Sequence, residues 1–149
     1  MRFIGHIEAK IDQKGRAFLP SVFRKELQTG GETLVLRKDV FQHCLVLYPE
    51  KVWNELSDSM RQRLNRWNPK EQLVYRQFMA DAEVVTLDGS GRFLISRRSQ
   101  EFAGIGTELS FIGMGDTIEI WAKENTETPF IDQEEFGNAL AELMKSQDI

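Results

Sequence analysis

Hydrophobic and polar residues alternate in several short segments of the chain, with the spacing of two that is typical of β-strands. Residues 3–11 and 83–87 show this alternation, and each segment leads into a sequence rich in turn-forming residues. Further short apolar segments predict additional strands at residues 17–19, 34–36, 45–48, 93–95, 109–111 and 118–121. The pattern therefore predicts a chain built mainly from short strands.

In the middle of the chain and near its C-terminus, apolar residues recur every three or four positions, which predicts amphipathic helices. One helix is expected between residues 52 and 67. Asn68 and Pro69 then end it and start a second helix that continues to about residue 82. A third helix is expected at residues 132–145. Two short helices are predicted at residues 21–27 and 96–103.

The chain contains an internal repeat. The segment IDQKGRAFL at residues 11–19 recurs as LDGSGRFLI at residues 87–95, which is 76 positions later, and the strands that follow recur less closely. Self-similarity of this kind indicates repeated structural units. The expected division is a first module at residues 7–54, a helical connector at 55–82, a second module at 83–126 and an acidic helical tail at 127–149. The expected fold class is α+β, mainly β.

Composition is that of a soluble globular protein. Hydrophobic residues make up 41% of the 149 positions and charged residues 28%. There is no apolar run long enough to span a membrane, and charges appear too early in the sequence for a signal peptide. We therefore expect a cytoplasmic protein with no membrane partner. The single cysteine, Cys44, excludes an intramolecular disulfide and a multi-cysteine metal site.

The net charge of −4 counts against a nucleic-acid partner when it is taken alone, but the charges are unevenly distributed. Residues 1–28 contain six basic and three acidic side chains, whereas residues 116–149 contain two basic and nine acidic ones. Because salt confines surface fields to about 8–10 Å, an acidic chain can still present a basic face. Charge alone leaves the question open.

Both copies of the repeat carry an Asp-x-x-x-Arg turn, at residues 12–16 and 88–92. The Asp carboxylate can accept backbone N–H bonds within the turn and pair with the Arg. A glycine before each Arg supplies the positive φ of a tight turn, and Arg can bind phosphate or the edge of guanine. The candidate DNA-binding residues are Lys14, Arg16 and Arg92, with Arg24, Lys25, Arg97 and Arg98 as secondary candidates, and the turn-shaping residues are Asp12, Gly15, Asp88 and Gly91.

Other interpretations compete with DNA binding. An Asp–Arg pair across a turn is often only a structural salt bridge, and its repetition leaves the two interpretations evenly balanced. Enzyme chemistry is not expected, because the sequence offers no nucleophile with a base and orienting group, no metal-ligand cluster and no cofactor loop. His6 and His43 have no neighbours that would make a metal site or catalytic triad. No cofactor, metal or small-molecule substrate is therefore expected.

Further motifs accompany the turns. They are Leu19-Pro20 and Phe23-Arg24, residues 44–49, Trp53, and in the second copy residues 93–95, 102–104 and 112–121. In their order and spacing, over residues 1 to about 124, these motifs and the two turns resemble the MraZ family of transcriptional regulators. The second copy departs from the family pattern at Ile95-Ser96 and Ser99-Gln100, where Arg97 and Arg98 offer compensating charges.

The resemblance implies two AbrB-like (SpoVT-AbrB) modules that form one pseudo-two-fold β-barrel with flanking helices. It implies a ring-shaped homo-oligomer that binds direct repeats in the promoter of the division and cell-wall gene cluster and represses it. Arg16 and Arg92 would contact DNA, with Lys14 beside the first. The implied location is the cytoplasm, associated with the nucleoid.

The alternative function is an oligomeric β-barrel scaffold whose basic loops bind an acidic protein. The helical spacing of Trp53, Trp67 and Phe78 predicts packing in the core or between subunits rather than a stacking platform for bases. Phe130 and Phe136 are expected to pack either on a neighbouring subunit or on their own core. The tail after about Lys123 matches no family motif.

Overall fold

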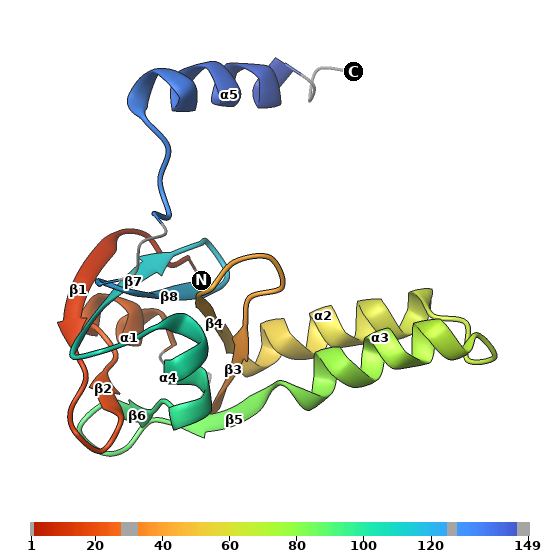
Figure 1. Cartoon of the computed structure of the whole chain (residues 1–149), viewed down its shortest axis with the longest axis horizontal. Helices are drawn as coiled ribbons and strands as arrows, with labels where there is room; N and C mark the ends of the chain where they lie inside the picture. Colours follow the sequence, from red (N-terminus) through yellow and green to blue (C-terminus); the bar gives the residue numbers. More distant parts are fainter. Residues whose placement is uncertain (1, 28–32, 125–127, 146–149) are drawn as a thin grey trace.

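The computed structural model describes residues 2–27, 33–124 and 128–145. Eight strands and five helices occur in these ranges (Figure 1). In chain order they are β1 (His6–Lys10), β2 (Arg16–Phe18), α1 (Ser21–Leu27), β3 (Thr33–Lys38), β4 (Leu45–Pro49), α2 (Glu50–Arg63), α3 (Pro69–Ala80), β5 (Glu83–Thr86), β6 (Arg92–Leu94), α4 (Arg97–Ala103), β7 (Glu108–Gly113), β8 (Ile118–Ala122) and α5 (Gln133–Lys145).

The strands of the two repeats are interleaved. Six of them form an antiparallel sheet in the order β1-β7-β8-β4-β3-β5, and β2 pairs with β6 in a separate two-stranded ribbon. The first strand of each repeat therefore pairs with the third strand of the other, because β1 lies beside β7 and β5 beside β3. The strand order is therefore symmetric: β1 and β5 are equivalent strands at the two edges, β7 and β3 are equivalent strands next to them, and β8 and β4 are equivalent strands at the centre. The α+β, mainly β fold with two pseudo-symmetric repeats is confirmed.

The registers of the two central strand pairs locate the pseudo-two-fold axis. In the sheet, β4 and β8 pair with Val46 opposite Glu119, and these residues occupy equivalent places in the two repeats. In the ribbon, Ala17 lies opposite Phe93, which again are equivalent residues. The axis thus passes through the middle of the sheet and the middle of the ribbon.

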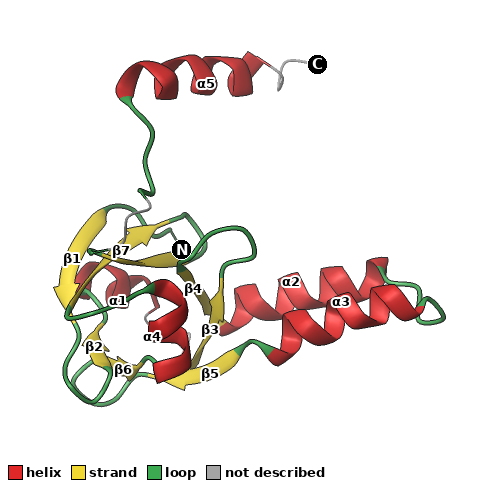
Figure 2. Ribbon diagram, in the orientation of Figure 1, coloured by secondary structure: helices red, strands yellow, loops and turns green. Residues whose placement is uncertain are grey.

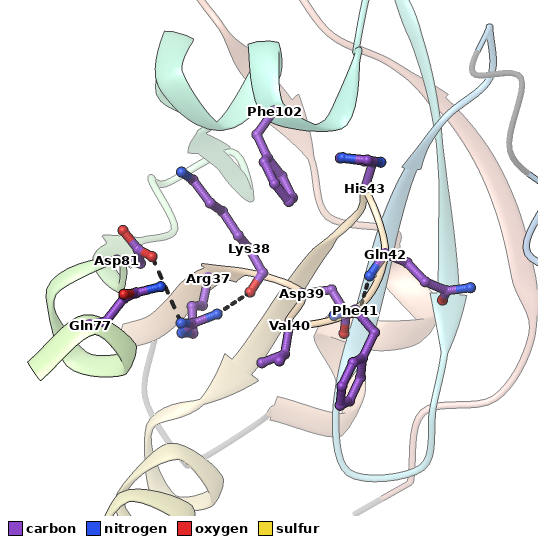
Figure 3. A pocket seen from close by; sticks show the side chains of 10 residues that line it. All are labelled: Arg37, Lys38, Asp39, Val40, Phe41, Gln42, His43, Gln77, Asp81 and Phe102. Atoms are coloured by element: carbon purple, nitrogen blue, oxygen red, sulfur yellow. Dashed lines mark hydrogen bonds and ion pairs between the residues drawn. The ribbon is translucent and has the colours of Figure 1, made fainter. Parts of the chain in front are cut away.

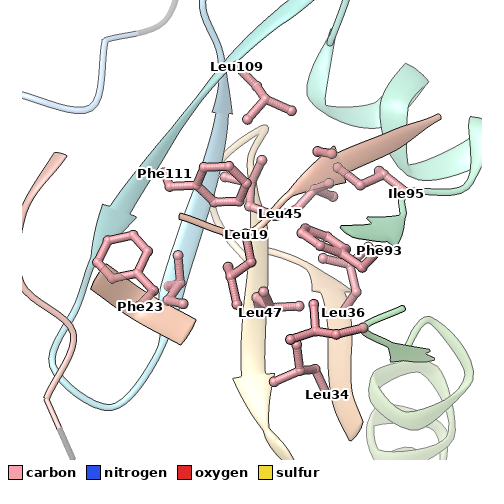
Figure 4. Close-up of a cluster of buried hydrophobic side chains, with 14 of the residues drawn as sticks. Leu19, Phe23, Leu34, Leu36, Leu45, Leu47, Phe93, Ile95, Leu109 and Phe111 are labelled. Atoms are coloured by element: carbon pink, nitrogen blue, oxygen red, sulfur yellow. The ribbon is translucent and has the colours of Figure 1, made fainter. Parts of the chain in front are cut away.

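The ribbon lies between the two edge strands of the sheet (Figure 1). The edge strands β1 and β5 lead through the Asp-x-x-x-Arg turns into β2 and β6, and an isolated bridge joins Ile11 to Ala17. Apolar side chains from both repeats form one core that includes residues of the sheet and of the ribbon (Figure 4). Phe93 of the ribbon contacts Phe111 of β7 edge to face, with ring centroids 6.2 Å apart. Both ribbon strands are therefore anchored by their inward-facing residues.

Helices α2 and α3 form a hairpin that projects from the β structure (Figure 2). Trp53 of α2 stacks on Phe78 of α3 with ring centroids 5.2 Å apart, which confirms that these two residues pack together. Trp67 does not pack in the core of the chain: it is 92% exposed, because α2 ends at Arg63 and the backbone becomes extended at Leu64. Packing of Trp67 in the core is therefore excluded, and its packing between subunits stays a prediction.

The cap of α3 and the position of α5 complete the helical structure. Asn68 caps α3 as predicted, since its side chain accepts hydrogen bonds from the backbone of Lys70 and Glu71. Helix α5 lies away from the β structure and has no buried residue along its length (Figure 1). In the segment before it, the ring of Phe130 contacts that of His6, with centroids 5.4 Å apart. Among the described helices, none is long and apolar enough to cross a membrane.

Candidate nucleic-acid interface

The two Asp-x-x-x-Arg turns have the same hydrogen-bond geometry. Asp12 Oδ1 accepts hydrogen bonds from the backbone N of Lys14 at 2.9 Å and of Arg16 at 2.8 Å, while its Oδ2 accepts one from Arg16 Nε at 3.0 Å. In the second turn Asp88 Oδ1 accepts from the backbone N of Ser90 at 2.8 Å and of Arg92 at 2.9 Å. Its Oδ2 accepts from Arg92 Nε at 3.0 Å. Each carboxylate thus holds both the turn and the arginine side chain.

These contacts stabilise the charged carboxylates. The backbone hydrogen bond from Arg16, helped by its guanidinium, holds the pKa of the Asp12 carboxyl below its ordinary value of 3.8. The backbone of Arg92, followed by that of Ser90, acts in the same way on the pKa of Asp88. At neutral pH, Asp12 and Asp88 therefore each keep a negative charge beside the guanidinium of their turn.

The glycines of the turns fit where other residues would not. Gly15 and Gly91 have φ values of 86° and 87°, in the left-handed region that side chains disfavour. Each also accepts a hydrogen bond from the other half of the ribbon: Gly15 O from Ile95 N at 2.8 Å and Gly91 O from Leu19 N at 2.9 Å. Each turn is thus fastened to the chain segment that follows the opposite ribbon strand.

The ribbon brings the two arginines together on one face. Because Ala17 and Phe93 point into the core, Arg16 and Arg92 lie on the outer face of the adjacent strands. Their side chains are 34% and 29% exposed. The structure therefore places the two principal candidates on a single surface, at diagonal corners of a short ribbon. Neither is buried in the protein interior.

The secondary candidates lie differently from one another. Arg24 of α1 reaches across to the second turn, where its Nη1 donates to Ser90 O at 3.1 Å. Its equivalent in the second repeat, Gln100, donates from Nε2 to Ile95 O at 2.7 Å, beside the first turn. Lys14 and Arg16 thus supply two cations at the first turn, and Arg24 and Arg92 supply two at the second.

Each repeat thus contributes a side chain to the turn of the other repeat. The sequence offered Arg97 and Arg98 as compensating charges in the second copy, and both are exposed on α4. Arg98 Nη2 lies 3.9 Å from the carboxylate of Glu83. Besides Arg92, the second turn is contacted by Arg24, which belongs to the first repeat. Sequence alone could not show this, because the contact depends on the interleaving of the repeats. Lys25 is exposed on α1.

Three potential metal ligands also lie close together, at the two ends of the β3–β4 loop and on β8. Potential ligand atoms of Asp39, Cys44 and Glu119 lie within 4.8 Å of one another. However, Asp39 accepts backbone hydrogen bonds from Phe41 and Gln42, and Glu119 accepts one from Trp121 Nε1 at 2.9 Å. These contacts give the two carboxylates a structural role, and we assign no metal to them.

A cavity of about 340 Å³ lies between the β3–β4 loop, α3 and Phe102 of α4 (Figure 3). Arg37 lines this cavity, and its Nε donates a hydrogen bond to Phe78 O at 2.9 Å. The guanidinium carbon of Arg37 lies 4.2 Å from the centre of the Phe78 ring. Nη2 of the same residue lies 3.9 Å from Asp81. Arg37 thus joins the sheet to the helical hairpin, and we assign no ligand to this cavity.

Comparison with known proteins gives a consistent result over the whole chain. The MraZ protein family model, whose description also calls the family antitoxin-like, matches residues 3–77 and again residues 78–144. Transcriptional regulator MraZ of Bacteroides fragilis is 55% identical over 148 residues, which cover 99% of this chain and 94% of the relative. The protein of the same name from Phocaeicola vulgatus is 57% identical over 145 residues, which cover 97% of this chain and 94% of the relative. The protein of this name from Clostridium tetani is 33% identical over 144 residues, which cover 95% of this chain and 98% of the relative.

Proposed function

The chain belongs to the MraZ family, and from that membership we propose that it is a transcriptional regulator that binds DNA sequence-specifically through its two Asp-x-x-x-Arg turns. The proposed target is a set of direct repeats in the promoter of the division and cell-wall gene cluster, which the protein represses. The acting form is a ring-shaped homo-oligomer in the cytoplasm, associated with the nucleoid. The observation that carries the proposal is the position of Arg16 and Arg92 on one face of the β2–β6 ribbon.

The geometry of the arginines suits contact with a polyanion. The contact between each Asp and its Arg uses Nε, at 3.0 Å in both turns. A guanidinium carries two further nitrogens, which can donate together to a phosphate or to the edge of guanine. The Asp contact orients the side chain in advance, so less conformational entropy is lost on binding. An exposed ion pair of this kind contributes little to stability, so stability alone does not explain why an arginine occupies this position.

Self-assembly would compensate for the small number of cations on each chain. Phosphate contacts strengthen binding in a strongly salt-dependent way, and several weak sites on one rigid assembly raise the effective concentration at successive DNA repeats. Avidity would thus supply what a chain of net charge −4 lacks. Equal affinity of a monomeric form and the assembled protein for repeat-containing DNA would contradict this explanation.

Helix α5 is the proposed contact between copies. A helix of 13 residues is marginal in water on its own, and the apolar side chains of α5 are between 43% and 58% exposed. Its acidic residues complement the basic end of the α2–α3 hairpin on a second copy. The apolar residues are Phe136, Leu140, Leu143 and Met144, the acidic ones Glu134, Glu135 and Glu142, and the basic ones Arg61, Arg63 and Arg66. Removal of residues 128–149 should reduce the oligomer size in light scattering, and an unchanged size would refute this assignment.

The test of DNA binding combines selection and substitution. Genomic fragments bound by the wild-type protein should share a short motif repeated at regular spacing. Arg16→Ala should abolish specific binding to that DNA while the oligomer remains intact, and Arg92→Ala should act in the same direction. Arg76→Ala provides a matched control, because Arg76 is exposed on α3 and outside the ribbon. Specific, salt-sensitive binding retained by Arg16→Ala would count decisively against the proposal.

The same measurements separate the alternative function. A scaffold whose basic loops bind an acidic protein would lose its partner to heparin and would show no preference for any DNA sequence. Sequence preference in the wild-type protein that is lost in Arg16→Ala would favour the regulator over the scaffold.

A further inference from the structure

Two large apolar side chains lie exposed on the outer face of the ribbon. Phe18 is 56% exposed and Leu94 is 54% exposed, whereas Ala17 and Phe93 on the inner face are buried. Phe18 and Leu94 are equivalent residues of the two repeats, since each is the last residue of its ribbon strand. Neither of them belongs to the core that holds the ribbon in place.

The apolar residues and the arginines form a compact patch. In the ribbon, Phe18 lies directly opposite Arg92, and Leu94 lies directly opposite Arg16. The two arginines therefore occupy one diagonal and the two apolar side chains the other. Residues two apart in a strand are about 7 Å apart, and paired strands are about 5 Å apart. The patch is thus about 7 by 5 Å, which corresponds to about two base-pair steps of about 3.4 Å each.

In the described part of the chain, a cation–π contact is found for one of the two apolar residues. The guanidinium carbon of Arg92 lies 5.8 Å from the centre of the Phe18 ring, within range of a cation–π contact. Leu94 has no π face and cannot offer such a contact to Arg16. What the two residues share is an apolar surface beside a cation, directed away from the core. A ligand with apolar and anionic groups a few ångströms apart would match it.

The major groove of DNA presents that combination. The groove is wide enough to admit a two-stranded β-ribbon, and thymine exposes there a methyl group that Phe and other apolar side chains contact. Resting on the proposed function, we propose that Phe18 and Leu94 read DNA sequence by packing against thymine methyl groups in the major groove. Arg16 and Arg92 bind the neighbouring phosphates or guanine edges. The ribbon, and not the turns alone, then determines which sequence is bound.

The experiment removes the methyl group from the DNA. The fragment selected by the wild-type protein is synthesised with deoxyuridine in place of individual thymines, and affinity is measured by fluorescence anisotropy. Loss of one contacted methyl should weaken wild-type binding about fourfold. Phe18→Ala and Leu94→Ala should bind the thymine-containing DNA more weakly and should each become insensitive to one of the replacements. Their salt dependence should equal that of the wild type, because no phosphate contact is lost.

Val84→Ala serves as the matched control, because Val84 is an exposed apolar residue on β5, outside the ribbon. It should keep the wild-type response to deoxyuridine. Thermal unfolding and light scattering of all variants verify that fold and assembly are unchanged. Specific binding that is indifferent to deoxyuridine, or a selected motif without thymine, would overturn the role of Phe18 and Leu94 but not the proposed function. A wild-type protein without any sequence preference would overturn both.

Discussion

Replacement of Gly15 by alanine tests whether the turn geometry is a requirement of the fold. Gly15 has a φ of 86°, where an L side chain costs about 1–2 kcal/mol. A Cβ at this position would lie 2.9 Å from Ile95 O and 2.7 Å from Gln100 Nε2. The Gln100 side chain can move, but Ile95 O belongs to the backbone at the end of the ribbon, which must shift.

The expected loss of stability follows from these contacts. A shift of the ribbon end weakens the hydrogen bond from Ile95 N to Gly15 O, which has a length of 2.8 Å. Loss of such a bond costs about 1 kcal/mol, so the total with the backbone strain is about 2–3 kcal/mol. For a chain of this size each kcal/mol lowers Tm by about 2–4 °C. Gly15→Ala should therefore melt about 4–12 °C below the wild type.

The measurement is thermal unfolding followed by circular dichroism, at one protein concentration because assembly shifts the apparent Tm. Gly89→Ala is the matched control. Gly89 lies in the second turn, no atom of the described residues lies within 4 Å of its added Cβ, and its φ is not positive. It should melt at or slightly above the wild-type temperature, because alanine restricts the unfolded chain. If both variants melted at the wild-type temperature, the proposed strain at Gly15 would be refuted.

Acidic pH, loss of a buried ring and loss of a helix cap should each lower the stability of the fold. Because the pKa values of Asp12 and Asp88 are lowered on folding, their stabilisation is present above their ordinary pKa of 3.8 and is lost as the pH falls through the lowered folded values. The difference in free energy of unfolding between the wild type and a double variant, Asp12→Asn with Asp88→Asn, should therefore shrink below about pH 4 in urea titrations. A constant difference down to about pH 2 would show that the two carboxylates do not stabilise the fold in their charged form. Phe93→Ala, which removes a ring that is 2% exposed, should lower the free energy of unfolding by about 3–5 kcal/mol in urea denaturation, and a loss below about 1 kcal/mol would show that the ribbon is not anchored there. Asn68→Ala should cost about 1 kcal/mol by loss of the α3 cap, whereas an unchanged urea midpoint would indicate that the cap contributes nothing.

Features that depend on neighbours in the sequence could be predicted. The cap at Asn68 and the glycine turns follow from short-range rules, and the short helix expected at residues 21–27 forms there as α1. The hydrophobic period also located the α2–α3 hairpin. The period wrongly placed Trp67 in the first of these helices. The apolar spacing continues past residue 63, whereas the helix ends there and the backbone is extended at Leu64.

Features that depend on distant pairing could not be predicted from the residues alone. An antiparallel strand such as β1 can pair with any strand of similar pattern, and only the assembled sheet shows that its partner is β7. The contact of Arg24 with Ser90 depends on that exchange, as does the proximity of Phe18 to Arg92. For this reason the sequence identified both arginines of the turns but neither the surface on which they meet nor the apolar residues beside them.

The two repeats differ in the side chains that they place around the ribbon, and this difference would affect the orientation in which the chain binds DNA. A symmetric dimer presents identical halves, and its operators are palindromic. Here the halves differ, with Lys14 where the other turn has Ser90 and Gln100 where the other helix has Arg24. A surface of this kind has polarity, so a chain bound to DNA in one orientation would make different contacts from a chain bound in the reverse orientation. Copies related by rotation around a ring would all face the same way, and the sites that suit them would be arranged head to tail.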